Sequence, residues 1–105
     1  MKLLSFFHFK HVFDKSNRVK CKEFIILEKN NALTFPRLGI SISKKNIQYS
    51  HERNQIKRII RESFRLIQHK LINSDFVVIV GSYSTDINRK LLVKKLENLW
   101  IHYYQ

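Results

Sequence analysis

Acidic side chains are scarce in this sequence. Eight Asp and Glu residues stand against twenty Lys and Arg residues, which gives a formal net charge of +12. A compact domain with this charge repels itself unless a polyanion neutralises part of it. Nucleic acid is therefore the partner class that the composition favours, and an anionic membrane surface is the second.

Cysteine, proline and glycine are also rare, with one, one and two residues. Cys21 has no partner for an intramolecular disulfide, so we interpret the chain as a reduced, cytoplasmic protein. An apolar content of 44% excludes a disordered tail and predicts a folded core. No apolar run approaches the ~20 residues of a membrane span, so we expect no membrane partner. The 105 residues predict a single domain, residues 1–105.

The positive charge is spread unevenly along the chain. Residues 1–73 contain sixteen basic and five acidic side chains, a net charge of +11. Residues 74–105 contain four basic and three acidic side chains, a net charge of +1. The first two thirds of the chain are therefore basic almost throughout, and the last third is nearly balanced.

Apolar spacing predicts alternating helices and strands. Helical spacing predicts helices over residues 5–15, 51–72 and 86–103. Apolar runs or a period of two predict strands over residues 19–28, 38–43 and 76–80. Ser50 is expected to cap the second helix, and Asn30-Asn31 to form the turn after the first strand. This order predicts a small α+β sandwich with helices on a sheet.

The second helix has two distinct faces. On a helical wheel one arc is apolar and must face the sheet: Ile56, Ile59, Ile60, Phe64, Ile67 and Leu71. The adjoining arc stacks cations at spacings of three or four: Lys57, Arg58, Arg61 and Arg65. A solvated helix surface normally interleaves acids with bases, but here only Glu62 is available and it falls outside the arc. We favour an RNA-binding face over a merely solvated one.

The residues at this point resemble a known family. Arg53–Arg65 resembles the signature helix of the bacterial ribonuclease P protein component. Arg37–Lys45 resembles the strand before that helix, and Asp75–Val80 the strand after it. Phe9–Phe13 resembles the family's first helix. The resemblance runs in the correct order from residue 9 to about residue 100.

The resemblance implies a fold and a function. The fold is a two-layer α-β-β-β-α-β-α sandwich with a left-handed βαβ crossover, an exception to the usual handedness. The implied protein is the subunit of a ribonucleoprotein that removes the 5′ leader of precursor tRNA. Its partners are the ribonuclease P RNA, with one protein per RNA, and precursor tRNA. The RNA performs the hydrolysis with Mg²⁺ that it holds itself, and the protein alone is inactive.

The resemblance also implies site residues. The RNA-binding positions are Arg53, Asn54, Lys57, Arg58, Arg61, Arg65, Lys44 and Lys45. Phe9 and Phe13 would line a cleft for the single-stranded leader, where bases stack on aromatic rings beside cations. Core packing is the alternative for the aromatic stripe of Phe6, Phe9 and Phe13, and we expect one or two of these rings in the core. Leu27 would add apolar contact if it points into the cleft.

Nothing in the sequence predicts catalysis by the polypeptide. The eight acids never form a close pair that could hold a metal, and no Gly-rich phosphate loop is present. His8 and His11 are more simply solvated or RNA-contacting side chains, and Cys21 a strand thiol. We therefore expect no catalytic residue and no metal ligand. The competing interpretations are a small ribosomal or rRNA-binding protein and, third, a peripheral membrane module.

Overall fold

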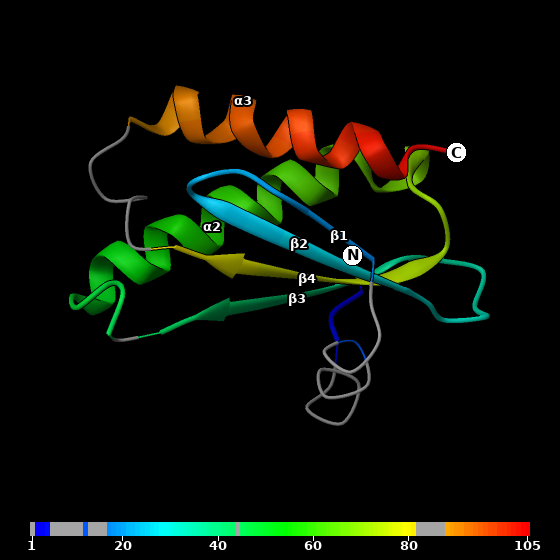
Figure 1. Ribbon diagram of the computed structural model, residues 1–105, viewed down its shortest axis with the longest axis horizontal. Coiled ribbons are helices and arrows are strands. Elements are labelled where there is room, and N and C mark those ends of the chain that lie inside the picture. Colours follow the sequence, from blue (N-terminus) through cyan, green and yellow to red (C-terminus); the bar gives the residue numbers. More distant parts are fainter. Residues whose placement is uncertain (1, 5–11, 13–16, 44, 82–87) are drawn as a thin grey trace.

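Within the residues that the structure describes, four strands form one mixed sheet that carries two helices on one face (Figure 1). The computed structural model describes residues 2–4, 12, 17–43, 45–81 and 88–105. The strands are β1 (Asn17–Lys20), β2 (Phe24–Asn30), β3 (Arg37–Ile42) and β4 (Ser74–Val80). The helices are α2 (Ser50–Ile67) and α3 (Arg89–Trp100), followed by the 3₁₀ turns Gln68–Lys70 and Ile101–Tyr103.

The strand order is β1-β2-β4-β3, with β2 antiparallel to both of its neighbours and β3 parallel to β4. The helix α2 therefore connects two adjacent parallel strands. In Figure 1 both strands point left, β4 lies above β3, and α2 lies behind the sheet. This arrangement makes the connection left-handed, against the usual preference. The predicted α+β sandwich is confirmed, while the helix expected over residues 5–15 lies outside the described residues except for Val12.

The single strand expected over residues 19–28 is wrong, because the chain reverses inside it. Lys20 pairs with Ile25 across the β1–β2 hairpin, and the Cys21 N–H donates to the Phe24 carbonyl at 2.8 Å. The tip of this hairpin is Lys22-Glu23, which contains none of the residues that typically mark a turn. The sequence around this hairpin therefore contains no local turn signal.

The predicted limits of the second helix need correction. The helix α2 begins at Ser50 itself, so Ser50 is not its cap, and Tyr49 at the cap position makes no side-chain cap bond. The helix ends at Ile67 and tightens into the 3₁₀ turn, several residues before the expected end. Leu71 is buried, as its place in the apolar arc required, but it lies beyond the helix.

The main core fills the space between the helices and the sheet. The apolar arc of α2 is confirmed, since Ile56, Ile59, Ile60 and Phe64 are all buried there. Phe64 and Phe76 each meet Trp100 of α3 edge to face, with ring centroids 5.6 and 5.4 Å apart. Such pairs add about 0.5–1.5 kcal/mol each beyond their burial.

One polar contact orients α3 on α2. The indole N–H of Trp100 donates to the hydroxyl of Ser63 at 2.9 Å, and both side chains are buried. Burying an indole N–H without a partner would be costly. Ser63 therefore fixes the depth and rotation at which the two helices pack.

The opposite face of the sheet carries a second, smaller apolar cluster. Leu27 of β2 and Val77 of β4 are buried against Val12, with Leu4, Ile25 and Ile79 partly buried around them. Successive β4 residues such as Val77 and Val78 are therefore buried on opposite faces. This double burial explains why β4 reads as a continuous apolar run, as expected for a strand covered on both faces.

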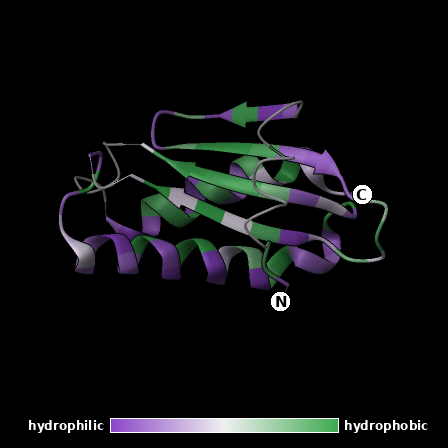
Figure 2. Cartoon of the chain, turned by 90° about the horizontal axis from the view of Figure 1, so that it is seen from below, coloured by the Kyte–Doolittle hydropathy of each residue, from purple (hydrophilic) through white to green (hydrophobic). Residues whose placement is uncertain are grey.

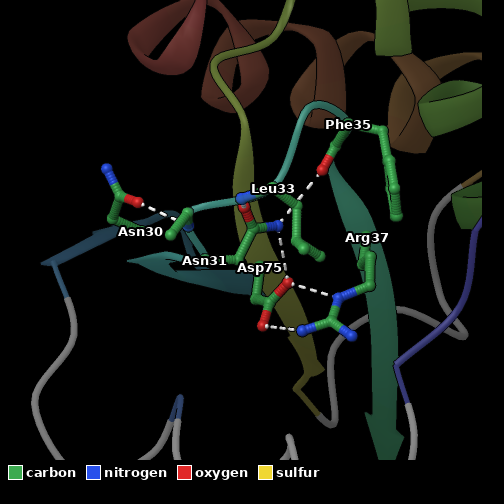
Figure 3. Close-up of polar contacts among 7 residues, drawn as sticks. Asn30, Asn31, Leu33, Phe35, Arg37 and Asp75 are labelled. Atoms are coloured by element: carbon green, nitrogen blue, oxygen red, sulfur yellow. Dashed lines mark hydrogen bonds and ion pairs between the residues drawn. The ribbon is translucent and has the colours of Figure 1, made fainter.

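A polar cluster closes the end of the sheet where β3 begins (Figure 3). Asp75, on β4, accepts from Arg37 Nε at 2.8 Å and from Arg37 Nη2 at 2.7 Å. Asn31 donates to the same carboxylate at 2.9 Å and to the Phe35 carbonyl at 3.1 Å. Ala32 adopts a positive φ of 56° in this turn. The turn predicted at Asn30-Asn31 begins one residue later, because Asn30 is still paired in β2, and Asn31 fastens the turn to β4.

The hairpin tip is joined to α3 by an ion pair. Lys95 donates to the buried carboxylate of Glu23 at 2.8 Å, and the Gly81 N–H donates to the Glu23 carbonyl at 2.8 Å. A Cβ on Gly81 would come within 3.2 Å of the Lys22 carbonyl oxygen, so a larger residue there would push the hairpin tip away by a few tenths of an ångström. Burial raises the pKa of Glu23, but the hydrogen bond and charge of Lys95 outweigh it and hold the pKa below its ordinary value of 4.5.

The lowered pKa of Glu23 predicts a pH dependence of stability. A carboxylate with a depressed pKa in the folded state contributes stability above its unfolded pKa and loses it as the pH falls through the folded value. Glu23→Gln is therefore expected to flatten the decline in the free energy of unfolding between about pH 6 and pH 3, measured by urea denaturation. Glu97→Gln, an exposed carboxylate on α3, is the control. Equal slopes for the two variants would contradict the prediction.

Candidate nucleic-acid interface

The outer side of α2 presents a row of exposed cations. Figure 2 shows hydrophilic segments recurring along this helix on the side away from the sheet. Arg58, Arg61 and Arg65 are exposed and line one shallow groove of about 470 Å³. The other described residues of this groove are Asn54, Gln55 and Glu62. The helical spacing of the sequence thus becomes one continuous cationic surface, which we call the α2 groove.

Lys57 faces a different side of the helix from Arg58. With Arg61 it lines a groove of about 180 Å³ against the edge of the sheet, whose other residues are Leu3, Leu4, Leu38, Gly39 and Ile40. Residues 2–4 run along β3 here, since the Leu4 N–H donates to the Leu38 carbonyl at 2.8 Å and the Leu38 N–H to the Lys2 carbonyl at 3.0 Å. No pattern in the sequence predicted this edge pairing.

Arg53 fastens the loop that precedes α2. Its Nη1 donates to the carbonyls of Ile47 and Gln48 at 2.8 and 2.9 Å. Ile47 is buried in the core, and the Asn46 amide donates to the Val80 carbonyl at 3.3 Å. Arg53 was predicted to face RNA, and the structure adds a structural use for one of its nitrogens.

The two lysines of this loop were also predicted to bind RNA. Lys45 is exposed, and its N–H donates to the hydroxyl of Ser43 at 3.0 Å. Lys44 lies outside the described residues. Lys45 is therefore an exposed cation in the loop that precedes α2.

Glu62 lies inside the cationic surface, so the expectation that it falls outside is wrong. Its carboxylate accepts from Arg65 Nη2 at 2.9 Å, one turn along the helix. That hydrogen bond, and then the positive charges of Arg65, Arg58 and Arg89, hold the pKa of Glu62 below its ordinary value. A helical wheel gives only the direction of each Cα–Cβ bond, whereas the long side chain of Glu62 extends sideways along the helix surface to Arg65. Both partners are about half exposed, so the pair contributes little stability but orients Arg65.

Arg89 is a cation that sequence reasoning missed. It is the first residue of α3, yet it lines a groove of about 240 Å³ together with Gln55, Arg58 and Ile59 of α2. No sequence pattern connects Arg58 with Arg89, because their proximity depends on how α3 packs on α2. The cationic surface thus crosses from one helix to the other.

The predicted leader cleft falls partly outside the described residues. Phe9 and Phe13 both belong to the undescribed part of the chain. The sheet face opposite the helices is described, and Leu27 does point to it, where it packs against Val12 and Val77. The register places exposed Arg18 beside Leu27 on one flank. This face therefore combines an apolar centre with a cationic edge.

The described residues offer no metal-binding cluster of three or more His, Cys, Asp or Glu side chains. No helix in the described part of the chain is both long and apolar enough to cross a membrane.

Comparison with known proteins places this chain in a family. The Ribonuclease P family profile matches residues 1–104. The chain belongs to the ribonuclease P protein family. The Ribonuclease P protein component of Buchnera aphidicola subsp. Baizongia pistaciae is 60% identical over 97 residues, 92% of this chain and 85% of that protein. That of Baumannia cicadellinicola is 48% identical over 105 residues, 100% of this chain and 91% of that protein.

A solved structure agrees with the fold. The ribonuclease P protein of Staphylococcus aureus superimposes with a TM-score of 0.86 at 29% identity, covering 93% of this chain and 90% of that one. The family resemblance predicted from the signature helix and its flanking strands is therefore confirmed. The Staphylococcus aureus protein thus has the same fold as this chain.

Proposed function

We propose that this protein subunit of ribonuclease P binds the ribonuclease P RNA through the α2 groove. The observation that carries the proposal is the alignment of Arg58, Arg61 and Arg65 along one groove, with Glu62 as the acid among its described residues. Guanidinium groups match phosphate oxygens in planar, two-pronged hydrogen bonds. The repulsion between cations one turn apart is relieved when phosphates lie between them. Asn54 adds an exposed amide to the same groove, and Lys57 adds charge in the neighbouring groove that it shares with Arg61. Lys45, exposed in the loop before α2, is proposed as a further RNA-binding cation.

The 5′ leader of precursor tRNA is the second proposed ligand. Leu27 and Val77 are buried beneath Val12, so they support this sheet face from below, and the exposed Arg18 supplies charge at its flank. Single strands bind where bases stack on aromatic rings beside such a cationic edge. Phe9 and Phe13 are the proposed stacking residues of this cleft.

Catalysis is proposed to reside in the RNA, with Mg²⁺ held by the RNA and one protein bound per RNA. The scattered acids of the sequence support this division of labour, since metal-dependent hydrolysis needs clustered ligands. A small ribosomal protein was the alternative interpretation of the charge and size. Membership of the ribonuclease P protein family favours the ribonuclease P subunit over that alternative.

Reconstitution tests the proposed function. We expect a bacterial ribonuclease P RNA to remove the leader of a precursor tRNA at low Mg²⁺ only when this protein is added. The protein alone is the control, and we expect it to cleave nothing. Cleavage by the protein alone would overturn the division of labour. No stimulation with several bacterial ribonuclease P RNAs, despite salt-sensitive RNA binding, would favour the ribosomal alternative.

A further inference from the structure

The groove between α2 and α3 differs in its composition from the α2 groove. Its described lining consists of two arginines, one amide and one apolar side chain: Arg58, Arg89, Gln55 and Ile59. Arg58, Arg89 and Gln55 are exposed, whereas Ile59 is buried beneath them. The groove therefore has cationic walls contributed by two different helices and an apolar floor.

The two arginines keep their hydrogen-bonding capacity for a ligand. Among the described residues neither Arg58 nor Arg89 forms an ion pair, since Glu62 is bonded to Arg65. Glu62 is nevertheless close enough for both Arg58 and Arg89 to act on it electrostatically. The two guanidinium groups line one groove, and the acid near both of them, Glu62, is bonded to Arg65. The groove therefore has positive charge that an anion can neutralise.

We propose that Arg58 and Arg89 together clamp one phosphodiester group of the bound RNA, so that α3 shares the RNA interface with α2. The proposal rests on the proposed function. Gln55 supplies an amide donor beside the phosphate, and Ile59 supplies an apolar surface for the adjoining sugar. The groove of about 240 Å³ is smaller than sites for drug-sized ligands, ~300–1,000 Å³, and suits a segment of a strand.

A phosphodiester has the acceptors that two guanidinium walls require. Its non-bridging oxygens can accept from two forks at once, one from each wall of the groove, and such charge-assisted bonds are the stronger kind. The occupant also continues along the cations of the α2 groove, because Gln55 and Arg58 line both grooves. An RNA strand that follows α2 would thus meet Arg89 as it passes α3.

The test is a double-mutant cycle on binding to full-length ribonuclease P RNA, measured across a series of salt concentrations. Arg58→Gln and Arg89→Gln are each expected to weaken binding about tenfold, as for loss of a charge-assisted hydrogen bond. The double variant is expected to weaken it by clearly less than the product of the two, because both arginines hold the same phosphate. Arg89→Lys is expected to lose most of the same affinity, since it keeps the charge and loses the fork.

Lys90→Gln is the matched control, because Lys90 is exposed on the same turn of α3, carries the same charge and lies outside this groove. We expect it to weaken binding by less than about threefold, the size of a general field effect. Equal losses for Arg89→Gln and Lys90→Gln would overturn the clamp, and so would Arg58 and Arg89 effects that multiply. Either result leaves the proposed function intact if Arg61 and Arg65 variants still reduce the salt dependence. The melting temperature of each variant is measured as well, and only variants that keep the wild-type value are compared.

Discussion

Replacing both Arg61 and Arg65 by alanine is expected to lower the log–log salt dependence of RNA binding by about two units. Each arginine that contacts a phosphate releases about one counterion when it binds, so each removal reduces the slope by about one. Both side chains are exposed on α2 and line the α2 groove, so their loss leaves the core intact. The measurement is the dissociation constant for ribonuclease P RNA at several salt concentrations.

Lys70→Ala provides a comparison for the loss of charge alone. Lys70 is exposed in the 3₁₀ turn after α2, where its ammonium lies 5.8 Å from the centre of the Tyr104 ring. We expect this variant to keep the wild-type salt slope. An unchanged slope in the Arg61/Arg65 double variant would remove the α2 groove from the interface.

Asp75→Ala is expected to destabilise the fold by about 3–5 kcal/mol, because it breaks a buried ion pair with Arg37. Asp75 is almost fully buried, and its two oxygens accept two hydrogen bonds from Arg37 and one from Asn31 (Figure 3). The guanidinium of Arg37 is itself mostly buried, so solvent cannot fully replace the carboxylate. Urea denaturation measures the loss in the free energy of unfolding.

Two further variants separate the ion pair from the hydrogen bonds around it. Asn31→Ala removes one bond to the carboxylate and is expected to cost about 1 kcal/mol. Arg37→Met combined with Asp75→Leu removes both charges and is expected to recover part of the loss, because no unpaired charge stays buried. A cost below about 1 kcal/mol for Asp75→Ala would show that the cluster is not what holds β3 to β4 at this end.

The helix α2 shows how far local periodicity reaches. Ile56, Ile59, Ile60 and Phe64 were expected on the apolar arc, and all four are buried between sheet and helices. The cations Arg58, Arg61 and Arg65 were expected on an adjoining arc, and they share one groove. Both results follow because an α-helix rotates by a fixed angle per residue, so the order of residues in the sequence decides which of them share a face. The sequences of the signature helix and its flanking strands were likewise sufficient to identify the family.

The hairpin at Lys22-Glu23 shows where local reasoning fails. No turn residue marks it, and it is held by contacts with Gly81 and Lys95, both far away in the chain. Residues 2–4 run along β3 for a similar reason. Their pairing with Leu38 is a contact between distant parts of the chain, and three apolar and basic residues do not predict it. Tertiary contacts determined both features.

The sequence by itself therefore determined the family, the alternation of helices and strands, and the two faces of α2, because each depends on the order and period of neighbouring residues. The tertiary structure alone decided three features of the surface. Arg53 holds the preceding loop, Glu62 turns into the cationic face, and Arg89 meets Arg58 across a groove. The physical reason is that side-chain reach and helix packing join residues that no periodicity relates.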